Sequence, residues 1–263
     1  MSVFNVYNKM RLTFLGTGTS TGVPEVGCPC PVCTSSDTRD RRLRVSVLVD
    51  TGAARILIDC GPDFREQMLH VPFDRLDGVL LTHEHYDHTG GIDDLRPFCR
   101  FGDIDIYADD LTCRHLRERL PYFFREVLYP GVPRLHFHPI APLCTLSIQG
   151  VEIIPLQVMH GKLPILGYRI GPVGFITDML TAPEETLEAL RGVHTLVING
   201  LRHTPHPSHQ TIEAAIDFAS KVGAHETYLI HMSHDAGLHA EQKSFFLPTC
   251  TWLMMEWRLR CKR

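Results

Sequence analysis

Short apolar runs recur along the whole chain, and their spacing predicts β-strands more often than helices. Hydrophobic and polar residues alternate from Arg11 onward and again over 45–50 and 54–60, where the short link Thr51-Gly52 favours an antiparallel hairpin. Continuous apolar runs elsewhere are typical of buried strands. The other predicted strands are 78–83, 104–109, 151–158, 168–170, 173–178, 195–200 and 226–231.

Helices are predicted between several of these strands. One follows strand 104–109, and a second begins at the capping-box pattern 181–184 and ends near Gly192. Ser208 can cap a third helix, which Gly223 can end. The apolar face of that helix has helical spacing: Ile212, Ala215, Ile216, Ala219 and Val222. Strands in series followed by strand–helix alternation predict two sheets covered by helices.

No internal repeat or low-complexity linker divides the sequence. We therefore expect a single domain over 10–263, with 1–9 as a short extension. Residues 17–44 are rich in Gly, Pro, Cys and Thr, which predicts an ordered loop. GTGTSTG (16–22) follows a strand but precedes no helical pattern, so a turn is favoured over a dinucleotide-binding loop.

The composition is that of an ordinary globular protein, with 44% hydrophobic and 21% charged residues among 263. A net charge of -4 provides no strong global field for nucleic acids or anionic membranes. No apolar stretch approaches the ~20 residues of a bilayer span, and the first residues lack a secretory signal pattern. We therefore expect a cytoplasmic protein with no membrane partner and with mostly reduced cysteines.

Histidine is frequent, with 16 residues, and three of them lie in HEHYDH (83–88) beside a carboxylate. Imidazole and carboxylate together suit zinc, manganese or iron better than calcium, which prefers oxygen ligands alone. A strand end that runs into a loop and a helix can turn His83 and His85 toward one ion and Asp87 and His88 toward another. The alternative is a solvent-exposed polar loop.

The HxHxDH pattern resembles the signature of the metallo-β-lactamase superfamily, whose fold is a four-layer αββα sandwich of the α/β class. The resemblance covers roughly 10–234, and the rest of the family's ligand series has matches in chain order. The matched positions are Asp59 in LIDCG, His160 in QVMHG, Asp178 in FITDM and His231 in YLIHM.

The resemblance implies two divalent catalytic metal ions, zinc or manganese or iron. The implied ligands are His83, His85 and His160 for one ion, Asp87, His88 and His231 for the other, and Asp178 as the bridge. Asp59 is expected to orient a ligand by hydrogen bonding, and Asp87 is also counted as catalytic. Two such ions can hold a bridging hydroxide and neutralise charge on attacking and leaving oxygens, which suits phosphodiester hydrolysis.

A second cluster, CPCPVC (28–33), places Cys28, Cys30 and Cys33 in the predicted loop. Thiolates at this spacing commonly bind zinc, and His234 is a candidate fourth ligand; the alternative is three free thiols near a turn. CxCxxC followed by a distant HxxH resembles the branch that contains the cyclic-phosphate phosphodiesterase of carbon–phosphorus lyase pathways. That resemblance implies one structural zinc and a small, cyclic phosphodiester substrate.

The same resemblance points to His209, which could contact phosphate or protonate the leaving oxygen as a general acid. An exposed histidine at a helix start is the alternative. His203 and His206 are weaker candidates at the rim. Nucleic acid is expected as a partner only in the form of a nucleotide.

Other functions use the same fold or the same residues. A tRNA 3′-processing nuclease shares HxHxDH but needs a protruding basic arm, which the sequence lacks. A lactonase or thioesterase shares the catalytic metals without the cysteine cluster. A metal-storing or redox-sensing protein would use these residues without catalysis. Asp178, as the predicted bridge between two metal ions, argues against that alternative.

Two segments lie outside these motifs. The aromatic stretch 121–142 is predicted to pack in the interior, with a lid or a homodimer contact as alternatives. The end of the chain, 250–263, has no alternating strand pattern, whereas the resembled branch usually ends in a strand like LAYDGxE. Codons for Thr251 to Trp257 can encode Leu-Ala-Tyr-Asp-Gly-Met in another frame, so we hypothesise a frameshift shortly before Thr251. Resequencing that finds incompatible codons would refute this.

Overall fold

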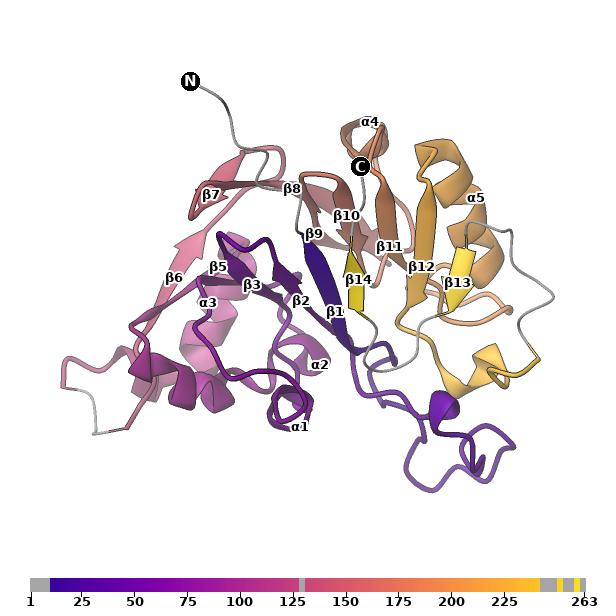
Figure 1. The fold of residues 1–263 in the computed structure, drawn as a ribbon, viewed down its shortest axis with the longest axis horizontal. Coiled ribbons are helices and arrows are strands. Elements are labelled where there is room, and N and C mark those ends of the chain that lie inside the picture. The colour runs from indigo at the N-terminus through magenta and orange to yellow at the C-terminus, as the bar shows by residue number, and fades with distance from the viewer. Residues whose placement is uncertain (1–9, 128–130, 242–249, 253–257, 261–263) are drawn as a thin grey trace.

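The computed structural model describes residues 10–127, 131–241, 250–252 and 258–260, and within them the strands form two sheets (Figure 1). The first sheet has the order β14 (Arg258–Arg260), β1 (Arg11–Gly16), β2 (Ser46–Asp50), β3 (Arg55–Ile58), β4 (Gly78–Leu80), β5 (Ile104–Ala108) and β6 (Leu135–Pro139). The second has the order β13 (Cys250–Trp252), β12 (Glu226–Ile230), β11 (Thr195–Asn199), β10 (Val173–Ile176), β9 (Leu163–Ile170), β8 (Val151–His160) and β7 (Leu146–Ile148).

Each sheet combines antiparallel and parallel pairing. β1, β2 and β3 pair antiparallel, which confirms the predicted hairpin, whereas β3 to β6 pair parallel. In the second sheet, β7 to β10 are antiparallel and β10 to β13 parallel. Parallel strands end at the same edge of a sheet, so loops that follow β3, β4, β10 and β12 can supply one common site.

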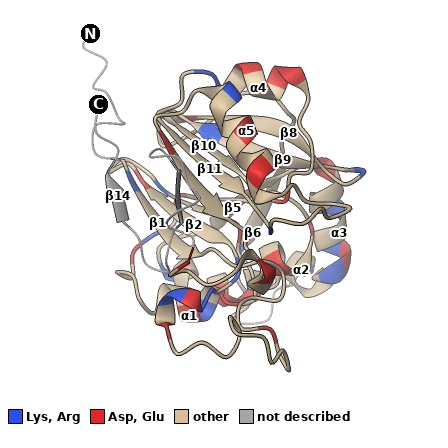
Figure 2. Cartoon of the chain, turned by 90° about the vertical axis from the view of Figure 1, so that its right-hand side faces the viewer, with Lys and Arg blue, Asp and Glu red and all other residues tan. Residues whose placement is uncertain are grey.

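The core consists of three apolar layers, which makes the fold the expected four-layer αββα sandwich. One layer lies between the sheets and includes Phe14 and Phe175. A second lies between the first sheet and its helices, α1 (Phe64–Met68), α3 (Asp110–Arg119) and η3 (Ile92–Arg100). The third lies under α4 (Glu184–Leu190) and α5 (Ile212–Val222). Acidic and basic residues are prominent on these outer helices (Figure 2).

Two predicted helix caps are wrong. Thr181 lies in a β-bridge with Met159, and α4 instead follows Pro183 as its N-cap residue. Ser208 lies upstream of α5, whose cap is Thr211, with its side chain accepting a hydrogen bond from the Ala214 N–H at 3.2 Å. For α5, Ser and Thr are both strong N-caps, so the sequence pattern alone did not select between Ser208 and Thr211.

Some strands and helices escaped the sequence pattern. β6, β7 and α1 were not predicted, and β9 begins at Leu163, five residues before the predicted strand 168–170. Gly167 and Pro164 interrupt β9's sequence pattern, and both residues lower strand propensity. The pairing of β9 with β8 from His160 to Ile153 overrides that local preference.

The aromatic stretch packs inward, as predicted, because Phe123 and Phe137 are buried in the layer beneath α3. The tail differs from expectation, since 250–252 and 258–260 form the short edge strands β13 and β14. The rest of the tail, 253–257 and 261–263, and the predicted extension 1–9 lie outside the described residues. The frameshift stays a hypothesis about the gene.

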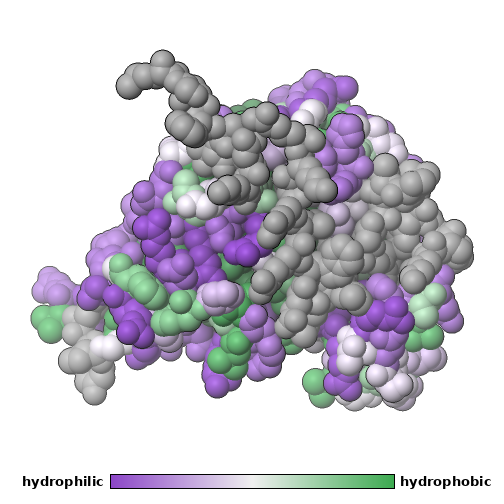
Figure 3. Space-filling view, in the orientation of Figure 1, coloured by the Kyte–Doolittle hydropathy of each residue, from purple (hydrophilic) through white to green (hydrophobic). Residues whose placement is uncertain are grey.

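The described surface is mixed in character. Hydrophilic residues are widespread on the face drawn in Figure 3, with apolar residues in smaller groups between them. Among the described residues, the structure contains no helix with the length and apolar character that a bilayer span requires.

Candidate metal centre

The HEHYDH segment leaves the end of β4 and turns at once into the short helix α2 (Tyr86–Thr89). His83 is buried just beyond the strand, and the exposed His85 is the N-cap residue of α2. Asp87 and His88 lie within the helix and are buried. The strand end therefore separates the segment into two pairs of side chains, as the sequence predicts.

The remaining predicted ligands arrive from other strand ends. His160 is the last residue of β8, His231 directly follows β12, and Asp178 lies two residues after β10. Asp59 directly follows β3. Asp59, Asp178 and His231 have φ angles of 59°, 57° and 55°. Such left-handed backbone is unfavourable for residues with a Cβ, and its concentration here is typical of functional sites.

The side chains converge into two adjoining groups. His83, His85 and His160 form the first, and the Nε2 of His83 lies 2.9 Å from the Nδ1 of His85. Asp87, His88, Asp178 and His231 form the second, which is fully buried. Asp178 also lies within ligand distance of His160 and His209, so it is the residue placed between the groups.

Asp59 orients one histidine of each group. It accepts a hydrogen bond from the His88 Nδ1–H at 2.7 Å and from the Thr82 hydroxyl at 3.0 Å. The Thr82 oxygen in turn lies 3.0 Å from the Nδ1 of His83. Both rings therefore direct Nε2 into the cluster, the arrangement that metal-binding histidines commonly show.

The donor set suits divalent metal ions. The Nε2 of His88 is buried and has no hydrogen-bond partner among the described residues, although carboxylate oxygens of Asp87 and Asp178 lie 3.1 and 3.2 Å away. The Nε2 of His231 lies 3.1 Å from Asp178. A buried polar atom without a hydrogen bond requires another partner, and a metal ion surrounded by these imidazoles and carboxylates would supply it.

Electrostatics favour charged carboxylates within the cluster. Burial opposes ionisation, but His88 and His231 outweigh it and hold the pKa of Asp87 well below its usual range. The same two histidines lower the pKa of the buried Asp178. Burial lowers the pKa of His83, which leaves its imidazole neutral and able to act as a ligand.

His209 lies against the cluster, with its ring centroid 4.6 Å from that of His160. Burial, together with the nearby His231, lowers the pKa of His209 to about 3, so its ring is neutral at pH 7. His206 contacts the ring of His209, whereas His203 pairs with Glu213 away from the cluster. Of the three, His209 contacts the cluster directly, and His206 contacts His209.

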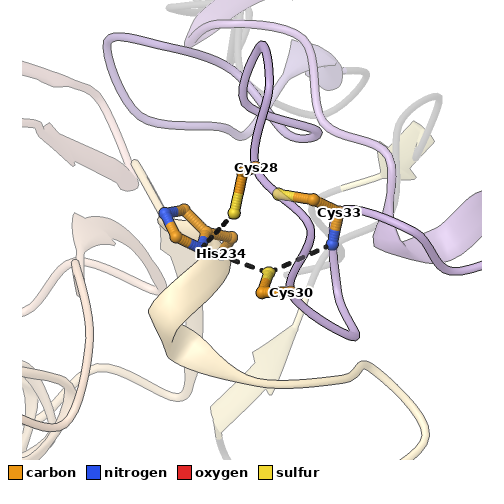
Figure 4. A group of neighbouring side chains, drawn as sticks. All are labelled: Cys28, Cys30, Cys33 and His234. Carbon is orange, nitrogen blue, oxygen red and sulfur yellow. Dashed lines mark hydrogen bonds between the residues drawn. The ribbon is translucent and has the colours of Figure 1, made fainter.

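The predicted cysteine cluster also forms, as Figure 4 shows. The Nδ1 of His234 lies 3.7 Å from the sulfur of Cys28 and 3.4 Å from that of Cys30, while its Nε2 lies 3.2 Å from a Glu25 oxygen. The Cys33 N–H, donated to the sulfur of Cys30, lowers the pKa of Cys30 to about 6. Burial raises the pKa of Cys33 to about 11.

The two clusters are joined through the loop 17–44, which lies beside the segment after β12 (Figure 1). The Thr19 N–H donates to the Met232 carbonyl at 3.0 Å, and the Met232 N–H donates to the Thr17 carbonyl at 3.1 Å. His234, in the short helix η5 (His234–Ala236), follows two residues later. The loop is thus fastened directly beside His231.

Residues that support the cluster include two that the sequence analysis missed. Thr82 links Asp59 to His83, and its position directly before the histidine motif was a usable signal. Arg119, on α3, has hydrogen bonds to Thr89 and to the Glu84 carbonyl, and so contacts both ends of residues 84–89, the α2 segment. No local motif marks Arg119, because its role depends on packing between elements.

Comparison with known proteins agrees with this geometry. The family model described as beta-lactamase superfamily domain matches residues 54–232. The chain belongs to the beta-lactamase superfamily. A crystal structure of a diphosphatase from the PhnP family resembles this superfamily member with 38% sequence identity and a TM-score of 0.88, covering 95% of this chain and 96% of that one.

Two further proteins are similar to this superfamily member. A Porphyromonas gingivalis protein named octanoyltransferase is 50% identical over 241 residues, which are 91% of this superfamily member but 49% of that protein. The chain thus spans about half the length of that relative. Zinc-bound PqqB from Methylobacterium extorquens is 18% identical, with a TM-score of 0.77 and coverage of 95% and 99%, a likeness of fold alone. The superfamily fold, the His/Asp cluster and the diphosphatase relative together support a metal-dependent hydrolase.

Proposed function

We propose that the protein is a dinuclear, metal-dependent phosphodiesterase that acts on small phosphodiesters, including cyclic ones. The observation that carries this proposal is the position of Asp178 between two adjoining groups of histidine and carboxylate ligands. The 38% identity with a diphosphatase over nearly the whole chain supports phosphate ester chemistry rather than lactone or thioester hydrolysis.

Each protein group has a definite task in this proposal. His83, His85 and His160 would hold one ion, and Asp87, His88 and His231 would hold the other. Asp178 would serve both groups, and Asp59 orients the rings of His83 and His88 by hydrogen bonds. Divalent ions bound there, zinc or manganese or iron, would activate water and neutralise charge on the phosphate.

His209 is assigned to phosphate binding. Burial lowers the pKa of His209, which favours its neutral form. A neutral imidazole can still donate one hydrogen bond, and its position beside His160 and His231 suits an oxygen of the substrate.

Cys28, Cys30, Cys33 and His234 are proposed to hold one structural zinc. Three sulfurs and one imidazole make a closed tetrahedral set, with no position left for substrate. Glu25 supports this role because its carboxylate contacts the far nitrogen of His234 and so turns Nδ1 toward the thiols.

The proposal also concerns the setting in which the enzyme works. A small phosphodiester is the expected partner, and a cytoplasmic location stays part of the proposal. Transfer of octanoyl groups is not proposed for this chain, because the match covers about half of the protein that has that name.

The proposal is tested by turnover of bis-p-nitrophenyl phosphate after loading with manganese or zinc, beside a monoester, a lactone and a thioester. Activity on the diester is expected, and a panel of cyclic phosphates and 2′,3′-cyclic nucleotides then ranks the substrates. Tight metal binding without any turnover would favour metal storage. Turnover of the lactone or thioester alone would favour another hydrolase.

A further inference from the structure

Arg119 lies at the end of α3 and contacts the segment that presents three of the predicted ligands. Its Nη2 donates to the Thr89 hydroxyl oxygen at 2.8 Å and to the Thr89 carbonyl at 3.1 Å. Its Nη1 lies 3.4 Å from the Glu84 carbonyl. Among the described residues, Arg119 has no carboxylate within ion-pair distance, so its hydrogen bonds go to the α2 segment alone.

The α2 segment needs such support because the helix spans only Tyr86–Thr89. A helix of one turn leaves most of its backbone groups without internal partners and is unstable by itself. Thr89 supplies part of the missing order, since its hydroxyl lies 3.0 Å from the Glu84 carbonyl and 2.8 Å from the His85 carbonyl. Arg119 holds the same hydroxyl and the same Glu84 carbonyl from outside.

The other ligands do not depend on this contact. His83 is fixed through Thr82 and Asp59 at the end of a buried strand. His160 is fixed by its Nδ1, 3.0 Å from the carbonyls of Asp178 and Ser208. His85 differs from them, because its carbonyl is held by the Thr89 hydroxyl that Arg119 contacts. Loosening of α2 would therefore act on His85, Asp87 and His88, which belong to both groups.

We propose that Arg119 is a positioning residue that holds the α2 segment in the conformation in which His85, Asp87 and His88 can bind metal. The inference rests on the proposed function, since it assumes that both groups bind metal. His115, also on α3, adds a contact between its Nδ1 and the Glu84 carboxylate. The last two turns of α3 thus support the α2 segment through contacts from outside it.

The test compares Arg119→Gln with Arg114→Gln, a matched control on the same helix. Arg114 is exposed and pairs with Asp110, without contact to the α2 segment. Purified, metal-loaded variants are dialysed against a series of chelator concentrations, and retained metal per chain is measured by mass spectrometry. Melting temperature and circular dichroism report folding separately.

For Arg119→Gln we expect catalytic metal to be lost at about 10–100-fold lower chelator concentration, the usual effect of removing support behind a ligand. With bis-p-nitrophenyl phosphate, kcat should fall while KM changes little, because Arg119 is proposed to act through the ligand segment and not on the substrate. Arg119→Lys, which retains a charged donor, should restore part of the affinity, and Arg114→Gln should match the unmodified protein.

Unchanged metal retention in Arg119→Gln, or an equal loss in Arg114→Gln, would overturn the inference. The inference would also be overturned if the loss of metal accompanied a fall in melting temperature and Arg119→Lys retained no more metal than Arg119→Gln. If the unmodified protein itself retains no metal beyond the cysteine cluster, the proposed function fails instead, and the two failures are distinguished by that measurement.

Discussion

The two candidate metal centres are built on different parts of the fold and from different donor atoms. The His/Asp cluster collects residues from strand ends of both sheets, and the group around Asp178 is fully buried. The cysteine cluster draws three donors from one loop and one from η5, and all four residues are half-buried. Open coordination suits a reaction, whereas four sulfur and nitrogen donors suit a closed structural site. The chemical identity of the donor atoms, and not only their closeness to one another, therefore distinguishes the proposed catalytic centre from the proposed structural one.

The largest expected effect comes from removing the residue between the two groups. Asp178→Ala should lower turnover by at least the ~10²–10³-fold that loss of a single transition-state contact costs. It should also reduce catalytic metal content, because the remaining histidines lose their shared carboxylate. Metal analysis and diester hydrolysis measure both effects.

Asp50→Asn is the control for Asp178→Ala. Asp50 is the last residue of β2, pairs with Arg11 and belongs to neither group of ligands. Its activity should be unchanged. Full activity of Asp178→Ala would remove the basis for a dinuclear centre.

The next effect concerns the cysteine cluster. Cys30→Ser should remove about one zinc per chain and destabilise the fold, because binding free energy at a structural site contributes to folding. Each kcal/mol lost should lower the Tm by about 2–4 °C in a chain of this size. Calorimetry and metal analysis test this.

Cys144→Ser is the matched control, because Cys144 is an exposed thiol outside the cysteine cluster. This substitution should leave both zinc content and Tm unchanged. Loss of activity in Cys30→Ser at full catalytic metal content and unchanged Tm would contradict a structural role.

A smaller effect is expected at Asp59, which contacts no metal in the proposal but orients a histidine in each group. Asp59→Asn should weaken both catalytic ions by about 10–100-fold, as removal of outer hydrogen bonds typically does. The cysteine cluster should keep its zinc. Chelator titration of both centres is the measurement, and selective loss of the cysteine-bound zinc would contradict the assignment.

The smallest effect is a pH dependence in the metal-stripped protein. The folded pKa of Cys30, about 6, lies below its ordinary value of 9.0, so its stabilising contribution is complete above about pH 9 and is lost as pH falls through 6. Cys33, raised to about 11, contributes below about pH 9 and loses its contribution as pH rises through 11.

Alkylation followed by mass spectrometry should therefore label Cys30 at much lower pH than Cys33. Identical labelling profiles for the two thiols would show that the hydrogen bond from the Cys33 N–H does not select Cys30.

The sequence predicted the site better than the elements around it. The predicted ligands lie at or just after strand ends: HEHYDH, His160, Asp178 and His231. Residues at strand ends can be brought to one edge of the sheets by the fold, so their place in the sequence pattern was informative. Thr89 and Arg119 could not be found in this way, since their contact joins elements 30 residues apart and depends on how α3 packs. The short strand β7 was missed, and β9 was predicted too short, because pairing with β8 rather than local propensity forms them.

His231 and His234 stand three residues apart, and Met232 between them is hydrogen-bonded to the cysteine loop on both its N–H and its carbonyl. A backbone displacement at one cluster would therefore be transmitted to the other. Thermodynamic linkage makes any such coupling reciprocal: the factor by which zinc at the cysteines tightens the catalytic ion equals the factor by which that ion tightens the zinc. Scarcity of one metal would then lower retention of both, and the chain would respond to metal supply as a cooperative unit.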